Sequence, residues 1–255
     1  MKPVIATDVD GILVKWQSGL PYFMAKYNIP TKTVLDIMVN DRFADAEELF
    51  GCNATLAKTL MNEYNNSDFI KYLAPYTDAI GVINRMKEHY DFVAITALGT
   101  TPEAQLNRMF NLNALFPGAF KDVLCVNYGE SKIPHYLDIK IKYKERLVCF
   151  VDDLAYNLED CHAVISELPL VWMPRQDYGR KPDCYVNRVH DWNELEKKIL
   201  SDDLIIHPAP VPSVAKPIEA VGGWPEEMAP PFKAPWTDPQ TVLLNETCKE
   251  QCIEL

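Results

Sequence analysis

The sequence is poor in the features that mark membrane proteins, exported proteins and nucleic-acid binders. No apolar run approaches the roughly 18 residues of a membrane span, and the start MKPVIATDVDG has too few apolar residues for a signal-peptide core. No Lys/Arg cluster is present, and 36 acidic against 25 basic residues give a net charge of −11, a sign that repels phosphate backbones. We therefore expect a soluble, cytoplasmic protein that binds no membrane and no extended nucleic acid.

Paired Cys-x-x-Cys motifs are also missing. The 7 cysteines show no spacing typical of a zinc site, and without an export signal they are expected to be reduced thiols. Cys248 and Cys252, one helical turn apart, would supply only two ligands, which is too few for a structural zinc site. Hydrophobic residues make up 48% of the 255 residues and charged residues 24%, so the chain can bury a core.

Short apolar runs alternate with amphipathic helical patterns along most of the chain. The predicted strands are Pro3 to Thr7, Phe92 to Thr96, Val123 to Asn127, Leu147 to Val151 and Leu170 to Met173. Helical patterns cover 78–90, 102–112 and 192–200, the last after Asp191 as its N-cap. Because continuous apolar strands are buried on both faces, this alternation predicts an α/β fold with a Rossmann-like parallel sheet and helices on both of its faces.

Two segments depart from this alternation. Residues 15–75 contain only helical patterns, which predicts a small all-helical cap inserted after the first strand. Residues 201–255 hold 9 of the 19 prolines and a net charge of −6, which predicts a Pro-rich acidic tail without regular structure. Residues 1–14 and 76–200 then form the core. The tail aromatics Trp224, Phe232 and Trp236 suggest docking on the same domain or on a neighbouring subunit of a homodimer, with a free tail as the alternative.

The first chemical signal is Asp8-Val9-Asp10-Gly11, directly after the first predicted strand. In open α/β sheets, ligands bind beyond the carboxyl ends of the strands, where both aspartates would lie. Two carboxylates there can divide the work, one as nucleophile or metal ligand and the other as proton donor. Gly11 permits the tight turn that lets a substrate approach.

The second signal is Asp152-Asp153, which follows the apolar strand LVCFV. Adjacent acids in a partly dry cleft repel one another and cost stability unless a cation or hydrogen bonds compensate. A divalent ion is the simplest explanation for the pair. As an alternative, Asp153 caps a helix that begins near Leu154.

A hydroxyl and an ammonium group lie between these acidic pairs in the sequence. Thr96 ends the strand FVAIT, where its hydroxyl and the following backbone N–H groups can hold a phosphoryl oxygen. Lys132 opens a predicted helix about twenty residues before Asp152, where its ammonium can contact the same oxygens. Lys142 and Lys144 are rivals for this role.

The order Asp-x-Asp, Thr, Lys, Asp-Asp resembles the haloacid dehalogenase (HAD) superfamily, chiefly its phosphohydrolases. The resemblance covers residues 1 to about 200, and the helical insertion matches the type 1 cap of that superfamily. Response-regulator receivers use similar residue types in another order, because their acidic pair comes first and their Thr and Lys come last.

The resemblance implies a role for each matching residue. Asp8 would attack phosphorus and become an aspartyl phosphate, while Asp10 would protonate the leaving oxygen and then deprotonate the hydrolytic water. Thr96 and Lys132 would neutralise charge on the transferring phosphoryl group. The implied Mg²⁺ ligands are Asp8, the backbone carbonyl of Asp10, and Asp152, with Asp153 as a further ligand or a partner of one.

Within the superfamily, the opening DVDGILVKW is most similar to the first motif of the 5'(3')-deoxyribonucleotidases, which also lack the usual Thr at the position of Ile12. The lysine of that branch lies closer to Lys142 than to Lys132. The cap supplies aromatic residues of which one or two would stack against a planar substrate group. They are Trp16, Tyr22, Phe23, Tyr27, Phe43, Phe50, Tyr64, Phe69, Tyr72 and Tyr76.

The sequence thus predicts a Mg²⁺-dependent phosphomonoesterase that acts on a small phosphorylated metabolite, with a (deoxy)nucleotide as the favoured substrate. One alternative is a 3'-phosphatase acting on nucleic-acid ends, which needs a basic groove that the sequence does not indicate. The other is a catalytically silent HAD-like scaffold that binds proteins through its tail. Acids at every motif position argue against the scaffold, since unused carboxylates in one cleft cost stability.

Overall fold

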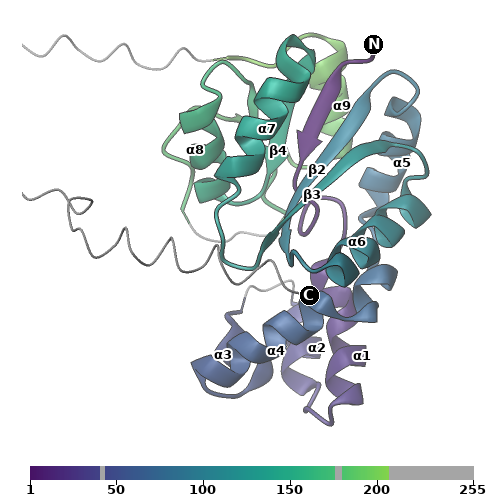
Figure 1. Ribbon diagram of the computed structural model, residues 1–255, viewed down its shortest axis with the longest axis vertical. Coiled ribbons are helices and arrows are strands. Elements are labelled where there is room, and N and C mark those ends of the chain that lie inside the picture. Colours follow the sequence, from purple (N-terminus) through teal and green to yellow (C-terminus); the bar gives the residue numbers. More distant parts are fainter. Residues whose placement is uncertain (41–43, 176–179, 207–255) are drawn as a thin grey trace, which may run out of the picture. The chain divides into compact units, whose positions relative to one another are not determined.

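The computed structural model describes residues 1–40, 44–175 and 180–206. Its centre is a six-stranded sheet of order β3-β2-β1-β4-β5-β6, in which every neighbouring pair is parallel (Figure 1). The strands are β1 (Val4–Thr7), β2 (Asp91–Leu98), β3 (Phe120–Asn127), β4 (Leu147–Asp152), β5 (Leu170–Trp172) and β6 (Asn187–Arg188). Because all the strands run the same way, their carboxyl ends lie at one edge of the sheet.

Helices cover both faces of the sheet, as predicted. One face carries α5 (Thr77–Met86), α6 (Pro102–Leu115) and α9 (Trp192–Leu200), and the other carries α7 (Ile133–Tyr143), the short 3-10 helix η3 (Lys144–Arg146) and α8 (Ala155–Val164) (Figure 1). Side chains of β1 alternate between the two layers: Ile5 packs in one hydrophobic core, and Val4 and Ala6 pack in the other. Burial on both faces explains why this strand is apolar throughout.

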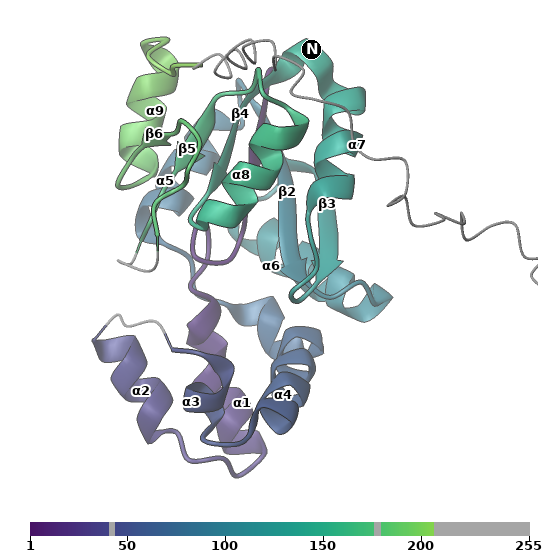
Figure 2. The same cartoon turned by 90° about the vertical axis from the view of Figure 1, so that its left-hand side faces the viewer.

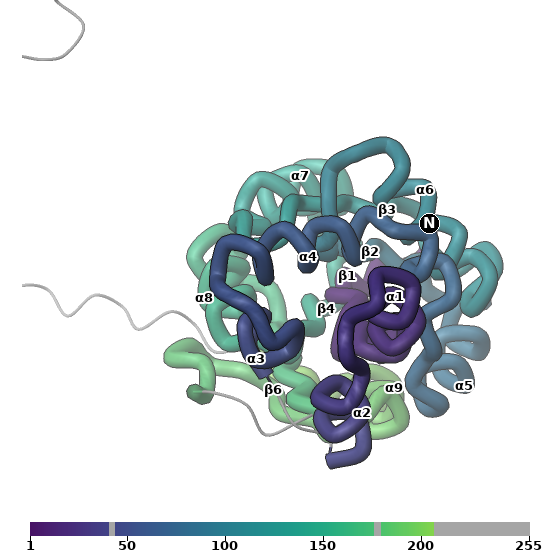
Figure 3. The backbone as a smooth tube through the Cα atoms, turned by 90° about the horizontal axis from the view of Figure 1, so that it is seen from below, coloured from purple at the N-terminus to yellow at the C-terminus, as the bar shows by residue number. Residues whose placement is uncertain are grey.

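The first part of the segment between β1 and β2, ahead of α5, forms the predicted helical insertion. It contains η1 (Trp16–Gly19), α1 (Leu20–Lys26), α2 (Lys32–Val39), α3 (Ala46–Phe50), α4 (Ala54–Asn66) and η2 (Asp68–Tyr72), and no strand among its described residues. Helices α1 to α4 lie beyond the end of the sheet at which β1 finishes (Figures 2 and 3). Phe23, Met61 and Tyr64 form its interior, which is continuous with the core layer of α5, α6 and α9.

The chain enters and leaves this insertion through neighbouring residues. Val14 forms an antiparallel bridge with Pro75, and the amide of Lys15 donates a hydrogen bond of 2.7 Å to the carbonyl of Ala74. The two crossing segments therefore lie side by side, directly after the Asp8 to Gly11 motif.

The predicted strands and helices differ from the observed ones mainly at their ends. Strand β2 continues two residues past Thr96, and β3 begins at Phe120, ahead of the predicted start. The short strand β6 was not predicted, because Asn187 and Arg188 carry no apolar run. Helix α9 begins where predicted, with Asp191 Oδ1 accepting a hydrogen bond of 2.8 Å from the amide of Glu194.

Residues 207–255 lie outside the described residues, and so do the predicted tail structure, its aromatics, Cys248 and Cys252. Before that point, Ile205 is held to β6, since its amide donates to Asn187 Oδ1 over 3.0 Å. The described cysteines are all free thiols, as expected: Cys52, Cys125, Cys149, Cys161 and Cys184. Among the helices of the described part, none is long and apolar enough to cross a membrane.

Candidate active site

Two neighbouring strand ends bring the distant acidic pairs together. Asp8 directly follows β1, Asp152 ends β4, and these strands are paired in the sheet. Asp8, Asp152 and Asp153 are buried, and each offers a carboxylate oxygen that lies within 4.8 Å of the others. The sequence expectation that early and late acids converge at one edge of the sheet is confirmed for these three residues.

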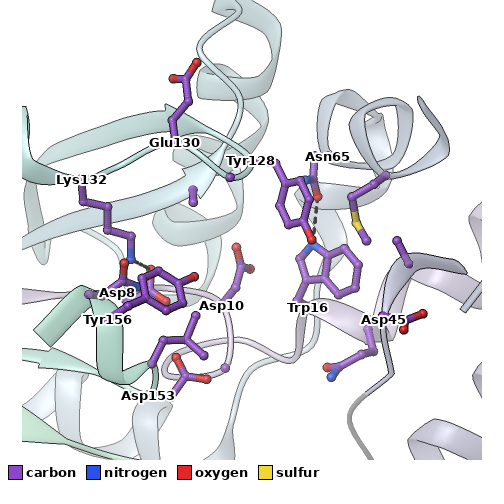
Figure 4. Close-up of a pocket in the computed structure, with 18 of the residues that line it drawn as sticks. Asp8, Asp10, Trp16, Asp45, Asn65, Tyr128, Glu130, Lys132, Asp153 and Tyr156 are labelled. Carbon is purple, nitrogen blue, oxygen red and sulfur yellow. Dashed lines mark hydrogen bonds and ion pairs between the residues drawn. The ribbon is translucent and has the colours of Figure 1, made fainter. Parts of the chain in front are cut away.

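Lys132 lies between Asp8 and Asp152 and pairs with both. Figure 4 shows it pointing toward Asp8. Its Nζ atom donates a hydrogen bond of 2.8 Å to Asp8 Oδ1 and one of 3.0 Å to Asp152 Oδ2. Burial acts to lower the pKa of Lys132, but the charges of Asp152 and Asp8 outweigh it and hold the pKa above its ordinary value. The rival Lys142 is exposed and pairs with Asp122 over 2.6 Å, so Lys132 is the lysine that the fold brings to this cluster.

Asp152 is fixed by hydrogen bonds from the start of α8. Its Oδ1 accepts from the amide of Leu154 over 2.9 Å, and both of its oxygens accept from Asn157 Nδ2, over 3.1 Å and 3.0 Å. Burial nevertheless raises its pKa to about 6, and the negative charge of Asp8 adds to this while Lys132 opposes it. The alternative placed Asp153 at the N-cap of this helix, but the N-cap of α8 is Leu154.

The acidic cluster fits a hard divalent cation. Its donors are carboxylate oxygens, which Mg²⁺ prefers, and one oxygen from each of the three acids lies within 4.8 Å of the other two. Lys132 supplies one positive charge against the three acids, so the cluster keeps an excess of negative charge in a buried place. The carboxylate of Asp10 is not part of this cluster, and its backbone carbonyl as a ligand stays a prediction.

Asp10 instead pairs with Arg108, a residue that sequence reasoning missed. Arg108 Nη2 contacts Oδ1 of Asp10 at 2.7 Å and Oδ2 at 2.5 Å, and its side chain is fully buried. Burial raises the pKa of Asp10, against the opposing charge of Arg108. The sequence did hold a signal that Arg108 is buried. Arg108 lies four residues from both Ala104 and Leu112, on the buried stripe of α6.

Thr96 is placed differently from the prediction. It does not end its strand, and its fully buried hydroxyl donates to Asp10 Oδ2 over 3.3 Å. The next residue, Ala97, lines the pocket described below, and Thr96 does not. The contact of the Thr96 hydroxyl with a phosphoryl oxygen stays a prediction, and the contact that the structure shows is with Asp10.

A pocket of about 610 Å³ opens over Asp8, Asp10, Lys132 and Asp153, between the core and the insertion (Figure 4). The insertion contributes Trp16, Gln17, Asp45 and Asn65 among others, and Trp16 Nε1 donates a hydrogen bond of 2.9 Å to Asn65 Oδ1. The core adds two half-exposed tyrosines, Tyr128 and Tyr156, which were not predicted.

One or two of the ten cap aromatics were expected to face a substrate. Among those that the structure describes, Trp16 alone lines the pocket. Phe23, Phe50 and Tyr64 are buried in the insertion, whereas Tyr22 and Tyr72 are exposed. Phe43 lies outside the described residues. Helical aromatics mostly pack inward, which accounts for the buried set.

The sequence has a clear relative in a bacteriophage. It is 45% identical over 201 residues to an uncharacterized 32.4 kDa protein in the Gp30–rIII intergenic region of Enterobacteria phage T4, a match that covers 79% of this chain and 71% of the phage protein. The chain belongs to the family of this phage protein. No protein-family model matches the sequence.

Solved structures of other proteins show which fold this chain has. The HAD-hydrolase YfnB from Bacillus subtilis, bound to magnesium, matches with a TM-score of 0.54 and 13% identity over 78% of this chain and 98% of that one. A haloacid dehalogenase-like hydrolase from Streptococcus pneumoniae matches with a TM-score of 0.53 and 15% identity over 77% and 97%. L-2-haloacid dehalogenase from Xanthobacter autotrophicus gives 0.51 and 12% identity over 78% and 99%. The fold is that of the HAD-like hydrolases.

Proposed function

We propose that this protein is a Mg²⁺-dependent phosphomonoesterase that hydrolyses a small phosphorylated metabolite through an aspartyl phosphate on Asp8. The convergence of Asp8, Asp152, Asp153 and Lys132 beneath one pocket carries the proposal. A set of acids around one lysine suits phosphoryl transfer, in which positioning and charge neutralisation supply most of the catalysis.

The residues of this chain would divide the reaction into two displacements. In the first, a carboxylate oxygen of Asp8 bonds to phosphorus, the bond to the leaving oxygen breaks, and Asp10 gives that oxygen its proton. In the second, Asp10 takes a proton from water, the water oxygen bonds to phosphorus, and the Asp8 carboxylate is released with inorganic phosphate as the other product. Lys132 would hold the Asp8 carboxylate and a phosphoryl oxygen throughout.

A magnesium ion held by Asp8, Asp152 and Asp153 would neutralise phosphoryl charge and lower the electrostatic cost of attack by a carboxylate. Asn157 supports this set by orienting Asp152 through its two hydrogen bonds. The amide of Leu154 adds a third hydrogen bond, to Oδ1 of Asp152. These contacts keep the ligand oxygens in place before an ion binds.

The substrate that the pocket favours is a nucleoside monophosphate. Trp16, Tyr128 and Tyr156 offer aromatic faces to a planar group, and Gln17 and Asn65 offer carboxamides to its polar edge. Lys132 is the one basic residue among those that line the pocket in the described part of the chain, whereas Asp45, Glu130 and Asp160 are acidic. This charge supports a small substrate over the end of a polynucleotide.

The test is phosphate release by the full chain from p-nitrophenyl phosphate, from 5'- and 3'-deoxynucleotides and from a 3'-phosphorylated oligonucleotide, with and without Mg²⁺. We expect turnover that needs Mg²⁺ and falls at least about 10³-fold in Asp8→Asn. Asp138→Asn, an exposed acid on α7, is the matched control and should keep wild-type turnover. Absence of phosphate release from every substrate would contradict the proposal, and faster release from the oligonucleotide would favour the 3'-phosphatase.

A further inference from the structure

Helix α6 turns a polar edge toward the interior. Helix α6 begins a few residues after Thr96. Its side chains Asn107, Arg108 and Asn111 are all buried there. Buried polar side chains cost folding free energy unless each is paired, so every one of the three needs an account. The two asparagines contact the insertion, and the arginine contacts Asp10.

The ion pair between Arg108 and Asp10 is short, but only one nitrogen of the guanidinium takes part in it. A single nitrogen, Nη2, reaches both carboxylate oxygens, at 2.7 Å and 2.5 Å. Among the described residues, Nε and Nη1 of Arg108 have no hydrogen-bond partner although both atoms are buried. A buried guanidinium with a single hydrogen-bonded nitrogen contributes little to the stability of the fold, because its desolvation is not fully compensated. A role in the reaction accounts for keeping it.

We propose that Arg108 is a positioning residue that holds the Asp10 carboxylate in the orientation from which it serves the leaving oxygen and the hydrolytic water. This inference rests on the proposed function. Arg108 does not line the pocket, whereas Asp10 does, so Arg108 acts through Asp10 and not on the substrate. Thr96 contributes the second fixed point, through its hydrogen bond to Oδ2.

Three contacts on one carboxylate restrict its rotation. Nη2 touches both oxygens and the Thr96 hydroxyl touches one of them, so a rotation of the Asp10 side chain would break at least one contact. A carboxylate that is already held in its reactive orientation loses no further rotational entropy when it transfers a proton. The expected effect is therefore on the rate of the chemical steps and not on substrate affinity.

The helix that carries Arg108 is itself fixed by the returning end of the insertion. Asn107 Nδ2 donates to the carbonyl of Ser67 over 3.0 Å, and Asn111 Nδ2 donates to the carbonyl of Leu73 over 3.2 Å. These contacts flank Arg108 along the helix. The guanidinium thus stands on a rigid support, as a positioning group requires.

A double-mutant cycle tests the inference, with wild type, Arg108→Met, Asp10→Asn and the double variant assayed on an alkyl phosphate such as a deoxynucleoside 5'-monophosphate. We expect Arg108→Met to lower kcat about 10²-fold and to leave KM within about twofold, since a general acid and base contributes 10² or more. In the Asp10→Asn background the same substitution should lower kcat by less than about threefold, because the group through which Arg108 acts is already lost.

The leaving group provides a readout that a purely structural role would not move. p-Nitrophenolate leaves without a proton, so in Arg108→Met the first-turnover burst of p-nitrophenolate should persist while the alkyl ester is cleaved about 10²-fold more slowly. Leu112→Ala, a buried apolar residue of α6 that makes none of these hydrogen bonds, serves as the control. It should lower the melting temperature without changing the ratio of rates for the two leaving groups.

Three results would overturn the inference, and a fourth would overturn more. The first is that Arg108→Met lowers kcat about 10²-fold in the Asp10→Asn background as well. The second is that Arg108→Met lowers the cleavage rates of both leaving groups equally and also lowers the melting temperature. The third is that Arg108→Met keeps wild-type turnover. The first would indicate direct contact with the phosphoryl group, and the second a structural role. A wild-type protein that releases no phosphate would instead contradict the proposed function itself, and the inference with it.

Discussion

Gly11 occupies a crowded backbone position of the site. Its φ angle of +79° lies in the left-handed region, and a Cβ atom placed on it would lie 2.5 Å from Oδ2 of Asp153. The turn that follows Asp10 can therefore be tight only because this residue has no side chain. The absence of a side chain at Gly11 thus permits both the left-handed backbone turn and the close approach of the Asp153 carboxylate.

We expect Gly11→Ala to lower the free energy of unfolding by roughly 2–3 kcal/mol and to displace the Asp153 carboxylate. The backbone strain alone costs about 1–2 kcal/mol, and the clash with Asp153 adds to it. Denaturant unfolding and the Mg²⁺-dependent shift of the melting temperature measure the two effects.

Gly118→Ala is the matched control for this substitution. Gly118 has a φ angle of +73°, and a Cβ atom on it would meet nothing within 4 Å, so only the backbone strain applies. It should leave the response to Mg²⁺ unchanged. Equal losses for the two variants, with equal responses to Mg²⁺, would show that the contact with Asp153 is unimportant.

Individual residues of the site differed in how well the sequence could predict them. Asp8 and Asp152 were predictable because each follows an apolar strand, and parallel strands deliver such residues to one edge. Lys132 and Lys142 could not be separated, since both lie on or next to one helix and only its orientation decides which reaches the acids. Arg108 was missed because arginine in an amphipathic helix is ordinarily exposed, and its partner Asp10 is 98 residues away.

At the scale of the element, α6 joins the strand that carries Thr96 to the insertion. Thr101 is its N-cap: the Thr101 hydroxyl accepts a hydrogen bond of 3.1 Å from the amide of Ala104 and donates one of 2.7 Å to Asn66 Oδ1. One side chain thus both starts the helix and ties it to α4. Loss of that side chain should affect both elements together.

We expect Thr101→Ala to lower the free energy of unfolding by about 2 kcal/mol, of which about 1 kcal/mol is the lost cap and about 1 kcal/mol the lost hydrogen bond to Asn66. Asn53→Ala is the matched control, because Asn53 caps α4 through the amide of Leu56 over 3.1 Å and is exposed. It should cost about 1 kcal/mol. Denaturant unfolding compares the two, and a Thr101→Ala loss no larger than that of Asn53→Ala would contradict the link to the insertion.

The elements themselves were largely predictable from the sequence. Strands buried on both faces leave uninterrupted apolar runs, so β1 and β4 were found within one residue of their bounds. Segment β6 was missed because its two residues are set by hydrogen bonds to β5 and to Ile205, which leave no local pattern. The sheet order, by contrast, depends on contacts between distant segments and could only be inferred from resemblance.

At the scale of the whole molecule, the site concentrates negative charge inside a protein that is already acidic. The chain carries a net charge of −11. Its site holds four carboxyl groups, those of Asp8, Asp152 and Asp153, which are buried, and that of Asp10, which is partly exposed. They face the cations Lys132 and Arg108, so with all groups ionised two negative charges are in excess. A bound divalent cation would remove that excess and stabilise the fold.

Saturating Mg²⁺ is therefore expected to raise the melting temperature of the full chain. Binding at 100 times the dissociation constant stabilises a protein by about 2.7 kcal/mol, which corresponds to roughly 5–10 °C for a domain of this size. Asp153→Asn should remove most of the shift, and the exposed Asp138→Asn should keep it. Identical melting curves with and without Mg²⁺ would contradict a metal site at these acids.

The same shift should depend on pH. Burial raises the folded-state pKa of Asp152 from 3.8 to about 6, so this carboxyl stabilises the metal-free fold at low pH and loses that contribution as the pH rises through 6. Protons and Mg²⁺ compete for its oxygens. The increase in melting temperature caused by Mg²⁺ should accordingly be largest above pH 6 and shrink below it, and a shift that grows on acidification would contradict this competition.

The paired crossing at Val14 and Pro75 gives the insertion a property of its own. A segment whose two ends are neighbours behaves as a cassette: its content can be lengthened, shortened or exchanged while the strands that carry the acids keep their register. Changes within residues 15–75 that spare Ser67 and Leu73, the contacts of α6, would therefore alter the part of the pocket wall that the insertion supplies and leave Asp8 and Asp152 in place.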